Sequence, residues 1–196
     1  MKETYFSVDI STVGTYPDLE MGYSMGSIAA YVVGNGETFF SLLKPMNENF
    51  TNDAVEKTGL TIGYLKEHGE PIALALANFT DWIHDNTPTG HRPVMISIDA
   101  AFDWMFLNWY LLTYSGKNPF GKACVDVRSY FMGMNCVNLS KSSKKYLRNH
   151  TMISNTKKDC PLTIAIEQGK IFQTILLMNR EKTMRPEIDS DQVVTI

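Results

Sequence analysis

The order of strand-like and helix-like segments constrains the fold of this chain more than any other feature of its sequence. Residues 5–10 form a short apolar, β-branched run, which is typical of a buried strand. Residues 27–43 contain two more strand-like runs around Gly34-Asn35-Gly36, and this turn signal predicts a hairpin. Further strands are predicted at 93–98 and 123–127, and helices at 52–58, 62–67, 71–84, 100–113, 129–134, 141–150 and 163–179. Three strands followed by alternating helices and strands predict an α/β fold, with a mixed five-stranded sheet flanked by helices.

The length and composition predict one folded domain. With 196 residues, of which 44% are hydrophobic, the chain is long enough to bury one sizeable core. Residues 181–196 are polar, contain a proline and show no hydrophobic periodicity. The expected organisation is therefore a domain over residues 1–180 and a polar tail over residues 181–196.

Charge and cysteine content exclude several classes of protein. The formal net charge is −3, so nucleic acid would have to meet a local basic surface rather than the molecule as a whole. Three cysteines without Cys-x-x-Cys spacing argue against a disulfide framework and against a zinc site. The sequence shows neither a signal-peptide pattern nor an apolar run of membrane-spanning length. These features predict a cytoplasmic protein that has no membrane partner.

Three stretches carry carboxylates at the ends of predicted strands or beside predicted helices. Asp9 lies in the first strand, within residues 5–12. Asp103 opens the helix after the 93–98 strand, in Phe102-Asp103-Trp104, and Asp159 precedes the last helix. Together these stretches resemble the DEDD superfamily of 3′-5′ exonucleases on a ribonuclease H-like fold. The resemblance extends over roughly residues 6–177. Residues 102–107, 116–121 and 126–133 are similar to one bacterial branch of these exonucleases.

The resemblance implies two divalent metal ions held by four carboxylates, which together cleave phosphodiesters. In the family, the first strand supplies an Asp-x-Glu pair, whose side chains share one face because residues two apart on a strand point the same way. Here the pair is Asp9-Ile10-Ser11, so a neutral hydroxyl replaces the second carboxylate. The family's second motif, Asn-x-x-Phe-Asp, is matched by residues 99–103, with Asp99 at the Asn position and Asp103 retained.

The family's third motif, His-x-Ala-x-x-Asp-Ala, has lost its reactive residues. Residues 165–169 set the alignment, which puts Asp159 at the position of the general-base His and Ile164 at the position of the metal-binding Asp. Ile164 binds no metal, and an aspartate accepts protons less well near neutral pH than an imidazole does. Ser11, Asp159 and Ile164 therefore replace three of the five reactive positions that the resemblance implies.

The remaining candidates for catalysis are Asp9, Asp103 and Asp159, and the candidate metal ligands are Asp9 and Asp103. They predict a site for Mg²⁺ or Mn²⁺ that holds one ion or none, because hard cations prefer oxygen ligands. Loss of a general base alone lowers a rate by roughly 10²–10⁴-fold, so weak or absent hydrolysis is expected. Asp99 has two interpretations, a rebuilt metal ligand or a helix N-cap. Asp159 likewise has two, a metal ligand or a cap of the last helix, and Glu167 is interpreted as a surface or structural contact.

A basic segment follows Arg128, because residues 128–158 contain no acidic side chain. The candidate nucleic-acid-binding residues are Lys141, Lys144, Lys145, Arg148, Lys157 and Lys158. They predict a groove for a single strand, and the alternative is an ordinary solvated helix face. Aromatic residues at helical spacing in 100–113 are predicted to belong to the core rather than to a base-stacking surface.

The leading hypothesis is a pseudo-exonuclease, which binds single-stranded nucleic acid and cleaves it weakly or not at all. One alternative is an active metal-dependent 3′-5′ exonuclease whose site is rebuilt from Asp9, Asp103 and either Asp99 or Asp159. The other is a protein-interaction module without nucleic-acid binding. Since related exonucleases often pair, a homodimer is also expected.

Overall fold

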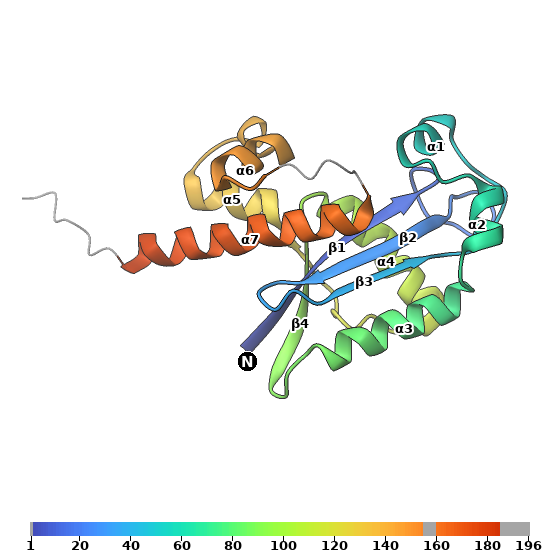
Figure 1. The fold of residues 1–196 in the computed structure, drawn as a ribbon, viewed down its shortest axis with the longest axis horizontal. Helices are drawn as coiled ribbons and strands as arrows, with labels where there is room; N and C mark the ends of the chain where they lie inside the picture. The colour runs from blue at the N-terminus through green and yellow to red at the C-terminus, as the bar shows by residue number, and fades with distance from the viewer. Residues whose placement is uncertain (1, 155–159, 185–196) are drawn as a thin grey trace, which may run out of the picture.

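One mixed sheet organises the computed structural model, which describes residues 2–154 and 160–184 (Figure 1). The strands are β1 (Lys2–Thr12), β2 (Met25–Val32), β3 (Thr38–Leu42), β4 (His91–Ser97) and β5 (Val125–Asp126). Their order across the sheet is β3-β2-β1-β4-β5. β1, β2 and β3 pair antiparallel, whereas β4 and β5 continue the sheet parallel to β1. The predicted α/β fold with an opening antiparallel hairpin is therefore confirmed.

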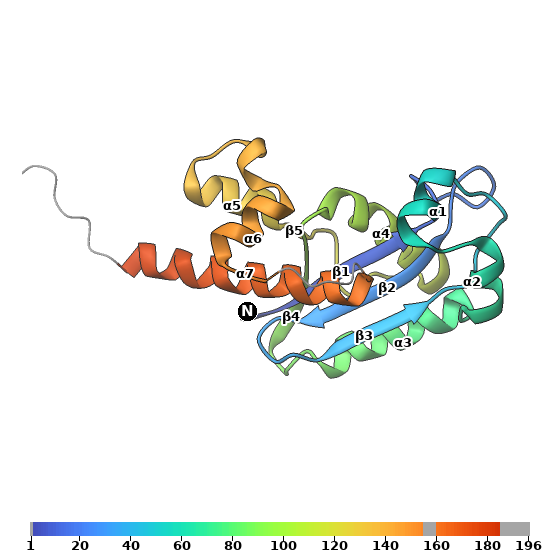
Figure 2. The ribbon, with the colours of Figure 1, turned by 45° about the horizontal axis from the view of Figure 1, so that its top comes forward.

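Helices cover both faces of this sheet (Figures 1 and 2). The helical elements are α1 (Asn52–Thr58), α2 (Ile62–His68), α3 (Ile72–Asp85), α4 (Ala100–Ser115), α5 (Val127–Asn135), the 3₁₀ helix η1 (Leu139–Ser142), α6 (Lys144–Thr151) and α7 (Pro161–Met184). α3 and α4 pack on one face. α7 crosses the other face with α5 and α6 beside it, and α1 lies near the end of β1 (Figure 2).

The alternation of β1 decides which side chains reach which layer. Phe6, Val8 and Ile10 are buried in the core under α3 and α4. Ser7 points to the opposite face, where its hydroxyl donates to the carbonyl of Ala165 in α7 over 2.7 Å. Because successive side chains of a strand point to opposite faces, Asp9 also lies on the α7 side of the sheet.

The last helix is longer than its sequence pattern predicts. α7 covers Pro161–Met184 instead of residues 163–179, so residues 181–184 of the expected tail are helical. Proline suits the first turn of a helix, because its missing N–H has no helical acceptor there. Residues 185–196, the rest of that expected tail, lie outside the described residues.

Two boundaries around α5 and α6 also differ from the prediction. The segment predicted as one helix over 141–150 is divided, because Ser143 caps α6 by accepting a hydrogen bond from the N–H of Tyr146 over 3.2 Å. β5 has only two residues, since the carboxylate of Asp126 accepts from the N–H of Ser129 and starts α5 at once.

Candidate functional site

Asp9 and Asp103 come together where two neighbouring parallel strands end. Asp9 lies near the end of β1, and Asp103 lies in the first turn of α4, directly after β4. β1 and β4 run parallel, so their carboxyl ends meet at one edge of the sheet. In open α/β sheets this edge is the usual place for a ligand site. The fold thus joins two carboxylates that are far apart in the sequence.

Both carboxyl groups hold their protons more tightly than an exposed aspartic acid does. Asp103 is 3% exposed, and burial, followed by the nearby charge of Asp9, raises its pKa well above the usual range. Burial raises the pKa of Asp9 to about 7, while Lys144 lowers this pKa and Asp99 raises it. Two crowded acids with raised pKa values are a favourable place for a bound cation, which would offset their repulsion.

Ser97 supports this pair, and the sequence analysis did not single it out. Its hydroxyl donates to Oδ2 of Asp103 and accepts from the N–H of Asp99 over 3.1 Å. Ser97 is fully buried at the last position of β4. Its place at the strand end, two residues before Asp99, was the only available signal in the sequence.

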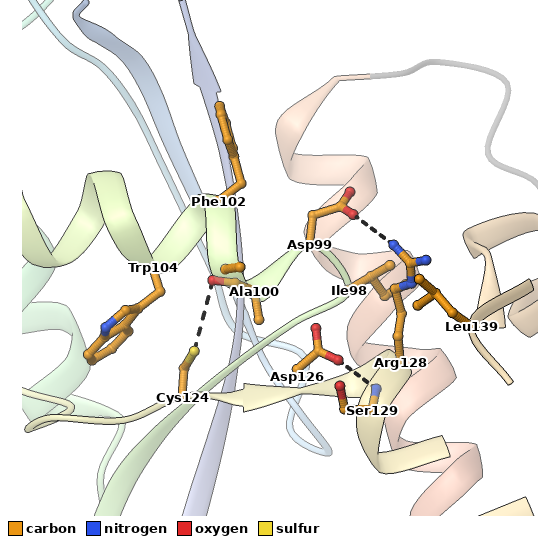
Figure 3. Close-up of a pocket in the computed structure, with 11 residues that line it drawn as sticks. Ile98, Asp99, Ala100, Phe102, Trp104, Cys124, Asp126, Arg128, Ser129 and Leu139 are labelled. Carbon is orange, nitrogen blue, oxygen red and sulfur yellow. Dashed lines mark hydrogen bonds and ion pairs between the residues drawn. The ribbon is translucent and has the colours of Figure 1, made fainter. Parts of the chain in front are cut away.

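Asp99 stands at the N-cap position of α4 without making the expected cap. Its side chain accepts no capping hydrogen bond. Instead, Oδ1 of Asp99 lies 3.7 Å from Nη1 of Arg128, and Figure 3 shows the two side chains pointing toward each other. Asp99 therefore occupies the predicted N-cap position. Its carboxylate, however, forms an ion pair with Arg128 instead of the expected capping hydrogen bond.

A cavity is lined by the start of α4, by β5 and α5, and by Leu139 (Figure 3). It has a volume of about 540 Å³. Its lining combines charged and apolar side chains: Ile98, Asp99, Ala100, Ala101, Phe102, Trp104, Cys124, Asp126, Arg128, Ser129 and Leu139. The Nε of Arg128 is buried without a hydrogen-bond partner, and Phe102 and Leu139 are exposed. The cavity therefore offers a cation and apolar surface next to the carboxylates.

Two positions that the family resemblance assigns to carboxylates, Ser11 in β1 and Ile164 in α7, carry no charge. Ile164 and Ser11 are partly buried and uncharged. Glu167 is 1% exposed, and its Oε1 accepts from Nε and Nη2 of Arg148 over 3.1 and 2.9 Å. The prediction of a structural contact for Glu167 is confirmed, but a surface position is wrong. Asp159 lies outside the described residues.

The packing of α7 is nevertheless close and specific. Gln168 donates through Nε2 to the carbonyl of Val8 over 2.6 Å and accepts from the N–H of Ile98 over 3.0 Å. A Cβ at Gly169 would approach within 2.5 Å of the Tyr31 ring and 3.1 Å of Ser7 Cβ, so only glycine fits this approach. α7 is thus held close to the ends of β1 and β4.

The predicted basic residues divide into two groups. Lys141 and Lys145 are exposed. Lys144 and Arg148 instead turn toward Glu167, at 3.9 and 2.9 Å from its Oε1. Lys157 and Lys158 lie outside the described residues.

Two further expectations concern the α4 aromatics and metal clusters. Phe106 and Tyr110 are buried in the core, and Trp104 and Trp109 pack against it, which confirms the predicted core role. Over residues 2–154 and 160–184, no group of three or more His, Cys, Asp or Glu side chains is arranged to hold a metal ion. Within the same ranges, every helix is too short or too polar to cross a bilayer.

Sequence comparison identifies the family. No protein-family profile matches the chain. It is, however, 38% identical to the 3′-5′ DNA exonuclease Cap18 of Escherichia coli over 134 residues, which are 68% of this chain and 70% of Cap18. The chain belongs to the DEDD superfamily of 3′-5′ exonucleases. Members of this superfamily use divalent metal ions.

Solved structures agree on the fold of this DEDD-superfamily chain. The nuclease domain of 3′hExo, a DEDDh family member bound to rAMP, superposes with a TM-score of 0.73 at 14% identity, over 90% of this chain and 93% of that domain. Product-bound exonuclease I gives a TM-score of 0.56 at 17% identity, over 93% of this chain and 44% of that protein. At these identities the likeness shows the ribonuclease H-like exonuclease fold alone.

Proposed function

We propose that this DEDD-superfamily chain binds the 3′ end of a single-stranded nucleic acid and hydrolyses it weakly or not at all. DNA is the first candidate, because the 38% identical relative is a DNA exonuclease. One observation carries the proposal: Asp9 and Asp103 meet at the sheet edge, while Ser11 and Ile164 bring no charge to them. A site with two carboxylates binds a polyanion with less repulsion than one with four, but it has little to hold a pair of metal ions.

The donor set fits one hard cation. Asp9 and Asp103 would hold Mg²⁺ or Mn²⁺ through carboxylate oxygens and water, since Mg²⁺ is commonly bound through one or two carboxylates. The raised pKa values of both groups support this fit. Burial and mutual repulsion favour the protonated carboxyl groups, and a bound cation would relieve the same repulsion in place of the protons. When bound, such an ion would supply positive charge to a phosphate. Ser97 keeps the carboxylate of Asp103 oriented for it.

The strand would follow the exposed cations beside the site. Lys141 and Lys145 supply charge on the outer surface. Lys157 and Lys158 are proposed to extend it from the segment that precedes α7. The cavity beside Arg128 and Phe102 has room for one nucleotide, with an aromatic face for a base and a guanidinium for a phosphate. A cytoplasmic location and a homodimer remain parts of the same proposal.

The direct test is a 3′-labelled single-stranded DNA incubated with the protein in Mg²⁺ and in Mn²⁺. The expected result is salt-dependent retention of the strand without shortening. Asp103→Asn is the matched control, because it removes one carboxylate while keeping the shape of the side chain. Rapid shortening by the wild-type protein that Asp103→Asn abolishes would refute the degenerate site.

One observation favours the second candidate, an active exonuclease with a rebuilt site. Asp99 lies close enough to raise the pKa of both Asp9 and Asp103, so a shift away from Arg128 would add a third carboxylate. In that case Asp99→Asn would abolish cleavage as fully as Asp103→Asn does. Absence of both cleavage and strand binding would leave the third candidate, an interaction module.

A further inference from the structure

Lys144 is a second cation beside a carboxylate that already has one. Glu167 is almost fully buried, and both the Nε and the Nη2 of Arg148 donate to its Oε1. The Nζ of Lys144 lies 3.9 Å from the same oxygen, beyond hydrogen-bond distance. The charge of Glu167 is therefore matched by Arg148, and Lys144 keeps its three N–H donors largely available.

Lys144 lies beside the part of α7 that packs against the ends of β1 and β4. Glu167 follows Ile164 by three residues, so the two share one face of α7, one turn apart. Gln168 attaches this same turn to the backbone beside Asp9 and Asp99, through Val8 and Ile98. The ammonium beside Glu167 thus lies at the turn of α7 that packs against the strand ends next to Asp9 and Asp99.

The electrostatics agree with this placement. Burial raises the pKa of Asp9, and Lys144 is the largest of the charges that oppose this rise, ahead of Lys57. The Lys144 side chain is 29% exposed, so it is also accessible to a ligand. A lysine that is close to the remaining carboxylates and still open to solvent is a poor structural element but a good anion contact.

We propose that the Lys144 ammonium is a built-in cation of this site, which takes over the charge of one of the family's two metal ions and binds a phosphate of the nucleic-acid strand beside Asp9. This inference rests on the proposed function and deepens it. It explains how a site without two of its carboxylates still receives a phosphate, since a fixed cation needs no ligands to hold it. It also separates Lys144 from Lys141 and Lys145, which act only through general surface charge.

The test compares Lys144→Met with Lys145→Met, which removes the same charge from an exposed neighbour on the same helix. Binding of a fluorescent single-stranded DNA is measured by anisotropy in excess chelator. Lys144→Met is expected to weaken binding by about tenfold or more, as for a lost charged hydrogen bond. Lys145→Met is expected to give a smaller loss, and Lys144→Arg a loss below that of Lys144→Met. Equal losses in the two methionine variants would overturn the proposal.

A second measurement does not depend on strand binding. Calorimetric titration with Mn²⁺ is expected to show roughly tenfold tighter binding to Lys144→Met than to the wild type, because a competing positive charge has been removed. Lys145→Met should leave it unchanged. If Lys144→Met does not alter Mn²⁺ affinity, Lys144 is no cation of this site. If the wild type binds no strand, the proposed function fails, and the Mn²⁺ comparison alone decides the role of Lys144.

A third measurement uses only the wild-type protein, in case Lys144→Met does not fold. Lysines are acetylated with and without bound single-stranded DNA, and the labelled positions are found by mass spectrometry. Protection of Lys144 well beyond that of Lys145 supports the proposal. Equal labelling of Lys144 in the two samples would contradict it.

Discussion

The two sides of the site differ in what they have kept. On the β1 and α4 side, Asp9 and Asp103 carry carboxyl groups at the positions that the family resemblance assigns to metal ligands, and Ser97 donates a hydrogen bond to Asp103. On the α7 side, the packing is retained through Gln168 and Gly169, but Ile164 has no charge. Gln168 and Gly169 attach the helix to the sheet, and Ile164 brings no metal-binding group. Scaffold and chemistry are therefore carried by different residues, and one can be lost without the other.

The largest effect is expected when the missing carboxylates are restored. Ser11→Glu combined with Ile164→Asp should raise Mn²⁺ affinity and increase cleavage of a 3′-labelled strand by roughly 10³-fold, because charge stabilisation is usually the largest catalytic contribution. Ser11→Gln with Ile164→Asn is the matched neutral control. A restored variant that binds Mn²⁺ no better than this control would show that the frame of α7 is not intact.

Next in size is the effect of removing Arg148. Arg148→Met would remove the cation that lies 2.9 Å from the buried Glu167 and leave Lys144 at 3.9 Å, so the free energy of unfolding should fall by roughly 3 kcal/mol. Urea denaturation measures this loss. Lys141→Met, an exposed lysine nearby, should change stability by less than about 0.5 kcal/mol. Similar losses in both variants would mean that the α7 side is not held by this pair.

The two carboxyl groups on the β1 and α4 side should make the stability of the protein depend on pH. Asp9 and Asp103 have raised pKa values in the folded state, so the stability from their tighter proton binding is complete below the pKa of an unfolded aspartic acid, roughly 4. It is lost as the pH rises through the folded value of Asp9, about 7. In chelator, the melting temperature should therefore fall between pH 5 and 8, beyond the trend of Asp9→Asn. Parallel pH profiles of the two proteins would contradict the buried acid pair.

The smallest effect is expected at Ser97. Ser97→Ala removes the donor to Asp103 and the acceptor for the N–H of Asp99, at a cost of about 1 kcal/mol. The same change should raise the pKa of Asp103 further, because the hydroxyl hydrogen bond lowers it. Ser140→Ala, at an exposed serine, serves as the control for stability. A carboxyl titration of Asp103 that is the same with and without Ser97 would argue against this support.

Most elements were predictable because their patterns are local. The apolar run before Asp9, the Gly34-Asn35-Gly36 turn and the helical spacing after Pro71 each depend on neighbouring residues alone. The predictions were wrong where a long-range contact or a cap decides. Asp99 was expected to cap α4, but Arg128, which is distant in the sequence, takes its carboxylate. One continuous helix over 141–150 was expected, but the cap at Ser143 divides the segment.

The sequence by itself determined that Ser11 and Ile164 bring no charge to the site, because both side chains are uncharged in any fold. It also determined the order of strands and helices, since hydrophobic periodicity is a property of the chain. Only the tertiary structure decided how the remaining charges are shared. Arg148 donates to Glu167 and Lys144 lies 3.9 Å from the same carboxylate, whereas Lys141 and Lys145 of the same basic segment are exposed. The physical reason is that a Coulomb interaction depends on distance and burial in space, and neither can be inferred from spacing along the chain.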